Sequence, residues 1–86
     1  MSCAQVQAKA GPATDELEAA YIAGAADELQ ATAQLGDAAA QFARVFADGG
    51  ATYQQQMQAL AQLSEAGARL NRASAAQLAR GLALQH

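Results

Sequence analysis

The chain has 86 residues, a formal net charge of −3, a single cysteine, and a 52% hydrophobic content in which alanine alone supplies 26 residues. This length allows one domain, the single cysteine excludes an internal disulfide, and the acidic balance argues against nucleic-acid binding, which requires clustered lysine and arginine. Because alanine favours helix and β-branched and aromatic residues are scarce, the composition predicts an all-α protein.

The first half of the chain predicts a tail followed by one long helix. Residues 1–13 contain Gly11-Pro12 and no apolar periodicity, so we predict a flexible N-terminal tail. A helix is predicted over residues 14–47, with Thr14 as its N-cap and acidic residues in its first turn. A single apolar stripe at 100° per residue fits this whole range. Gly36-Asp37 leaves open a break, in which the glycine ends one helix and the aspartate caps the next.

A turn and a second helix follow. Asp48-Gly49-Gly50 is typical of a turn, because two glycines permit positive φ and stop a helix. Thr52 and Gln55 then match a capping box. We predict a turn at residues 48–51 and a helix over residues 52–83. A connection this short makes the helices antiparallel neighbours, so the predicted fold is a coiled-coil-like two-helix hairpin.

Large apolar side chains form one stripe on each predicted helix at 100° per residue. These stripes are expected to meet in a hairpin core made of Leu17, Tyr21, Leu35, Phe42, Phe46, Tyr53, Met57, Leu60, Leu63, Leu78 and Leu82. Folding about Gly50 pairs residues whose numbers add to about 100. Glu28 and Asn71 then lie at one level near the centres of the stripes. We predict that Glu28 contacts Asn71 or Arg72 and fixes the register; the alternative is that Glu28 reaches water at the seam edge.

The residue inventory argues against an enzyme. His86 is the terminal residue, and Ser64 and Ser74 have no base within reach. Histidine and cysteine are too few and too far apart for a metal site, and no phosphate-binding loop is present. We therefore predict no catalytic site, no cofactor, no metal and no small-molecule ligand.

A pair of helices covers only one side of each, so some apolar side chains are expected to remain exposed. The candidate partner interface consists of Ile22, Leu29, Leu70 and Leu84. Adjacent exposed apolar residues usually mark a protein contact. Helices that lie on membranes carry lysine and arginine on their polar face, and the first helix here is acidic. The partner is therefore expected to be another protein or a second copy, with no membrane involved.

The opening of the second helix, Thr52-Tyr53-Gln54-Gln55-Gln56-Met57-Gln58-Ala59-Leu60, resembles that of the small helical-hairpin co-chaperones of bacterial type III secretion needle subunits. The resemblance extends over about 30 residues, and Gly-Gly replaces the proline that often precedes the tyrosine. It implies a cytoplasmic hairpin that binds a tetratricopeptide-like chaperone, the two together holding the needle subunit unpolymerised.

Two other secretion hypotheses remain open. One is an exported hairpin of the type VII Trp-x-Gly family, although the Trp-x-Gly turn is missing here. The other is a self-assembling needle or rod subunit. Residues 1–20 lack the apolar core of a cleaved signal peptide, so we expect a cytoplasmic protein or one exported without such a signal.

Overall fold

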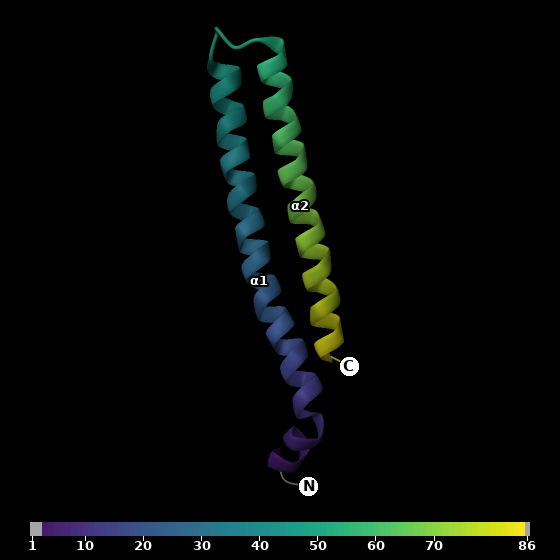
Figure 1. The fold of residues 1–86 in the computed structure, drawn as a ribbon. Coiled ribbons are helices and arrows are strands. Elements are labelled where there is room, and N and C mark those ends of the chain that lie inside the picture. The colour runs from purple at the N-terminus through teal and green to yellow at the C-terminus, as the bar shows by residue number, and fades with distance from the viewer. Residues whose placement is uncertain (1–2, 86) are drawn as a thin grey trace.

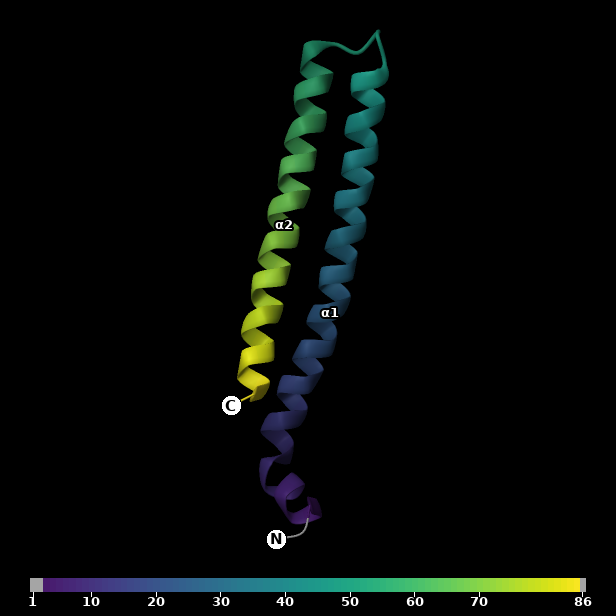
Figure 2. The same cartoon turned by 180° about the vertical axis from the view of Figure 1, so that it is seen from behind.

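The computed structural model describes residues 3–85 as two helices that lie side by side (Figure 1). Helix α1 is Cys3–Ala47 and helix α2 is Tyr53–Gln85. The helices run in opposite directions and stay adjacent along the whole of α2, as the reverse view also shows (Figure 2). The molecule measures 71 × 14 × 13 Å between its Cα atoms, so it is a rod. The predicted all-α antiparallel hairpin is confirmed.

Helix α1 is continuous and longer than the sequence predicts. It passes through Gly36 and Asp37 without a break, and a methyl group added at Gly36 would meet no atom within 4 Å. It begins at Cys3 and not at Thr14, so residues 3–13, predicted as a flexible tail, are helical; residues 1–2 lie outside the described residues. Figure 1 shows a bend near this end of α1. The sequence has a proline, Pro12, within residues 3–13, and proline lacks the amide hydrogen of a regular helix.

Short-range hydrogen bonds hold the turn between the helices. The Ala51 amide donates to the Asp48 carbonyl at 3.1 Å, and the Gly50 amide donates to Asp48 Oδ1 at 2.9 Å. The capping box is confirmed, because the Gln55 amide donates to Thr52 Oγ1 at 3.1 Å and the Thr52 amide to Gln55 Oε1 at 2.8 Å. No residue of the described chain has a positive φ, so the turn does not use the left-handed conformation that its glycines permit.

The two helices meet along a seam that is rich in small residues. The seam consists of Gly24, Glu28, Ala31, Leu35, Ala38, Phe42 and Val45 from α1 and Ala59, Leu63, Ala66, Leu70, Ala73, Gln77, Arg80 and Leu84 from α2, all buried or half-buried. Their alternating spacing of three and four is the heptad pattern of a coiled coil. Glycine or alanine occupies three positions spaced seven residues apart on each helix, Gly24, Ala31 and Ala38 on α1 and Ala59, Ala66 and Ala73 on α2. These small residues let the two backbones approach closely.

Most of the predicted core residues lie beside the seam and not in it. Leu35, Phe42, Met57 and Leu63 are half-buried, whereas Leu17, Tyr21, Phe46, Tyr53, Leu60, Leu78 and Leu82 are exposed. Tyr53 and Leu78 keep 75% and 68% of their surface. The cause on α2 is the line of small residues Ala59, Ala66 and Ala73, which draws the helices together on one edge of that helix's apolar stripe. No large side chain of the described chain is fully buried.

Candidate interaction surface

A simple rule sorts the residues that flank the seam. Each residue of a helix is rotated by about 100° from the one before it, so the residues before and after a seam residue turn to opposite sides. Because the two helices are antiparallel, the residue that follows a seam residue turns to the same side on both. The hairpin therefore has two long faces, one formed by preceding residues and one by following residues.

Preceding residues form the polar face, which is lined by Asp27, Gln34, Gln41, Asp48, Gln55, Gln62 and Arg69. Three shallow grooves run along this face and share lining residues, since Gln62 belongs to two of them and Gln34 and Arg69 to another two. Arg69 Nη1 donates to Gln34 Oε1 at 2.7 Å across the helices. Amides and charges that are already hydrogen-bonded or solvated make this face hydrophilic.

Following residues and the large side chains near them form the apolar face, which carries Tyr21, Ile22, Leu29, Phe46, Tyr53, Leu60, Leu78 and Leu82. One shallow groove on this face is lined by residues of both helices, among them Tyr21 and Leu78, which places the two helices' apolar residues on one side of the rod. A methyl group added at Gly81 would lie 3.5 Å from the ring of Tyr21, in agreement with this placement. All of the exposed large apolar side chains of the described chain except Leu17 are thus gathered on this face or its edge.

Two of the four residues predicted for the partner interface are exposed, and two are not. Ile22 and Leu29 lie on the apolar face and are 70% and 72% exposed. Leu70 and Leu84 are half-buried in the seam, so they contact the other helix instead. Sequence reasoning missed Tyr53 and Leu78 as surface residues. The signal that would have found them is the seven-residue repeat of small residues, which marks the seam more reliably than the large side chains do.

The apolar face is not uniform along the rod. Near the turn, the rings of Phe42 and Phe46 stack with centroids 4.4 Å apart. Near the open end, Ile22 and Leu78 project from the two helices. Between these ends α2 presents the small residues Ser64, Gly67 and Ser74, and a methyl group added at Gly67 would meet no atom within 4 Å. The α2 side of the face is therefore low in its middle, while Leu29 projects from α1.

A buried glutamine cluster joins the helices near the open end. Gln77 is only 8% exposed; its Nε2 donates to the Tyr21 carbonyl at 2.9 Å, and its Oε1 accepts from Arg80 Nη1 at 3.0 Å. The Gln77 side chain lies over Gly24, where a Cβ atom would collide with Oε1. A larger residue at position 24 would therefore push the ends of the Gln77 and Arg80 side chains out of this arrangement. A satisfied polar group in an apolar seam disfavours shifted pairings, because each shift would bury it without a partner.

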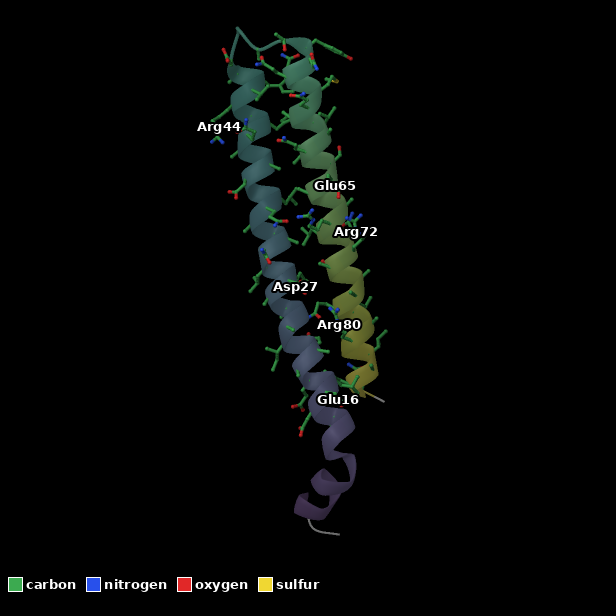
Figure 3. The ribbon with its side chains drawn as sticks, in the orientation of Figure 1. Glu16, Asp27, Arg44, Glu65, Arg72 and Arg80 are labelled. Carbon is green, nitrogen blue, oxygen red and sulfur yellow. The ribbon has the colours of Figure 1, made fainter. Side chains whose placement is uncertain are left out.

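The predicted register pair does not form. Glu28 is half-buried, Asn71 is exposed, and no hydrogen bond joins them in residues 3–85. Arg72 instead pairs with Glu65 of its own helix at 3.3 Å, and Figure 3 shows both side chains on α2. Exposed ion pairs contribute little to stability, so pairing with Glu28 would not stabilise Arg72 enough to draw it away from Glu65. Gln77 takes over the role that the sequence assigned to Glu28.

Within residues 3–85, no three histidine, cysteine, aspartate or glutamate side chains are close enough together to hold a metal ion. Neither described helix has a stretch apolar enough to cross a membrane. Comparison with protein-family models, with curated proteins and with solved structures gave no match to this chain.

Proposed function

We propose that this chain is a non-enzymatic protein–protein interaction module whose apolar face binds amphipathic helices of another protein. One observation carries the proposal: the large apolar side chains that remain exposed are gathered on one face of the hairpin, because small residues in the seam bring the helices together beside them. A contiguous apolar surface of this kind usually marks a protein contact. A short chain without a large core also depends on a partner for much of its stability.

The charge distribution supports a protein ligand over a lipid surface. Seven of the eight acidic residues lie in residues 1–48, and the whole chain has only five lysines and arginines. Helices that lie on membranes use basic side chains beside their apolar face to bind anionic lipids. An acidic α1 would be repelled from such a surface. An acidic helix beside an apolar face suits a protein partner that carries basic residues at the edge of its own apolar stripe.

In its finer form, the proposal is a secretion co-chaperone that keeps a helical partner soluble in the cytoplasm. The support is the resemblance of residues 52–60 to the needle-subunit co-chaperones, together with the position of Tyr53 at the turn end of the apolar face. A tetratricopeptide-like protein is the suitable partner class, because its stacked helix pairs form an extended concave binding surface. The rod shape also suits the alternative, a self-assembling or exported subunit of a secretion system.

The experiment is affinity capture from the native host with three baits. The first is the unaltered chain, the second carries Ile22→Ser and Leu78→Ser on the apolar face, and the third carries Gln41→Ala and Gln62→Ala on the polar face. Circular dichroism first verifies that all three are helical. We expect mass spectrometry to identify a protein that is lost with the second bait and kept with the third, because only the second removes apolar contact area.

Two results would count against the proposal. Equal recovery of the same proteins by all three baits would mean that the apolar face does not select them. If the unaltered chain captured no specific protein, the proposed role as an interaction module would be wrong. Recovery of a partner that is not tetratricopeptide-like would retain the module but overturn the co-chaperone form.

A further inference from the structure

We propose that the first occupant of the apolar face is a second copy of this chain, and that the two rods pair face to face with their turns at the same end. The proposal rests on the proposed function, since it assumes that this face binds protein. It adds the identity and geometry of the occupant. The resulting assembly is a closed four-helix bundle, and a helical partner has to displace one copy to bind.

The area of the face matches what a stable dimer needs. Helix α2 has 33 residues, and at ~1.5 Å per residue it is about 50 Å long. The rod is 14 Å wide between Cα atoms, so two copies that overlap along α2 cover about 700 Å² each, or about 1,400 Å² together. Specific protein interfaces bury on the order of 1,200–2,000 Å² in total. One face of this rod is therefore enough for a specific contact.

Two arrangements satisfy twofold symmetry for rods paired through one face. With the turns at the same end, α1 of each copy lies against α2 of the other, antiparallel to it. With the turns at opposite ends, α1 lies against the second α1 and α2 against the second α2. Both arrangements are closed, because the same patch is used on each copy. They differ in which helices become neighbours.

The net charges of the two helices favour one of these arrangements. Residues 1–48 carry seven acids and two bases, whereas residues 49–86 carry one acid and three bases. Placing α1 against a second α1 brings two acidic helices together, while placing it against α2 pairs an acidic helix with a basic one. Charge complementarity of this kind specifies orientation more than it adds affinity. The arrangement with the turns at the same end is the complementary one.

The shape of the face agrees with that choice. In the same-end arrangement, each residue of α1 faces α2 of the second copy at the same height along the rod as it faces α2 of its own hairpin. Bulky side chains then meet at the two ends, and Leu29 of one copy comes over the low middle of α2 around Ser74 and Gly67. Leu29 is 72% exposed and contacts little in its own hairpin, so it is available to fill that hollow.

The first test compares two neighbouring substitutions in the full chain. Leu29→Glu adds a charge to the apolar face, and Gln30→Glu adds the same charge on the side of the polar grooves. Light scattering coupled to size exclusion is expected to give twice 8.8 kDa for the unaltered chain and for Gln30→Glu. Leu29→Glu is expected to raise the dimer dissociation constant by roughly tenfold or more, because it places a charge in an apolar contact. Circular dichroism checks that both variants keep their helices.

The second test measures orientation. A spin label at Gly49→Cys, in a Cys3→Ser background, reports the distance between the two turns. Turns at the same end give a distance on the order of 20 Å, and turns at opposite ends give one on the order of 50 Å. The shorter distance is expected, and the longer one would overturn the same-end arrangement.

The remaining outcomes separate this inference from the proposed function. A chain that stays monomeric, but whose capture of a host protein is lost with Ile22→Ser and Leu78→Ser, would overturn the homodimer and leave the proposed function standing. Species that grow without limit as concentration rises would overturn the closed pair in favour of an open assembly. A dimer that Leu29→Glu and Gln30→Glu weaken equally would overturn the assignment of the face.

Discussion

The seam and the apolar face lie side by side on the same two helices, yet they differ in composition. The seam alternates leucine and other large residues with six glycine or alanine residues and includes one buried amide, Gln77, whereas the apolar face carries exposed leucine, isoleucine, tyrosine and phenylalanine. Small residues bury little area but allow close and specific backbone contact. The seam therefore defines the shape of the hairpin, while the side chains with the most apolar area to bury lie outside it.

The largest loss of stability is expected when a large residue replaces a small one in the seam. Ala31 is 3% exposed, so Ala31→Leu leaves no room for the added atoms and should cost about 1–3 kcal/mol of unfolding free energy. Ala33→Leu is the control, because Ala33 is exposed on the same helix and leucine is nearly as good a helix former as alanine. Urea denaturation at one fixed chain concentration measures both. Equal stability of the two variants would contradict the small-residue seam.

The glutamine cluster gives the next largest effect. Gly24→Ala should displace the Gln77 side chain, break its hydrogen bonds and cost about 1–2 kcal/mol, even though alanine favours helix. Gln77→Ala removes the obstacle, so the double variant should be more stable than Gly24→Ala alone. A double-mutant cycle measures this coupling. Simple additivity of the two substitutions would mean that Gly24 does not accommodate Gln77.

The two helices differ in whether a threonine caps their first turn, and loss of such a cap costs about 1 kcal/mol of unfolding free energy. Thr52→Ala removes the hydroxyl that accepts from the Gln55 amide and should destabilise α2 by that amount. Thr14→Ala is the matched substitution on α1, where the threonine lies inside a helix that begins at Cys3. It should be neutral or slightly stabilising, because alanine is the better helix former. Thermal unfolding followed by circular dichroism distinguishes the two, and a loss of stability in Thr14→Ala would restore the N-cap predicted from the sequence.

The sequence was sufficient for the elements that depend on local chemistry. The turn after Ala47, the capping box of Thr52 and Gln55, and the antiparallel pairing all follow from residues within a few positions of each other. The orientation of the helices about their own axes was mispredicted, because it depends on which side of each helix meets the other. On α2 the large side chains suggested one seam, and the alanine repeat produces another that is rotated toward the edge of the stripe.

The difference between local periodicity and tertiary register also explains why exposed residues such as Leu78 were predicted in the core. Leu78 follows Gln77 by one position, and that single step moves it from the seam to the exposed face. A buried amide at Gln77 is costly unless it finds hydrogen-bond partners. The compensating partners are the Tyr21 carbonyl and Arg80, which lie on different helices. Their convergence depends on the tertiary register, which local periodicity does not specify.

The smallest expected effect concerns the turn, where the glycines do not adopt the positive φ that the sequence suggested. Gly49 has no positive φ, and a methyl group added there would meet no atom within 4 Å. Alanine fits the folded chain at this position and restricts the unfolded chain, so Gly49→Ala should raise the unfolding free energy by about 0.4–1 kcal/mol. Urea denaturation at fixed chain concentration is precise enough to give the sign. A destabilised variant would show that the turn needs a conformation reserved for glycine, and that Asp48 alone does not close it.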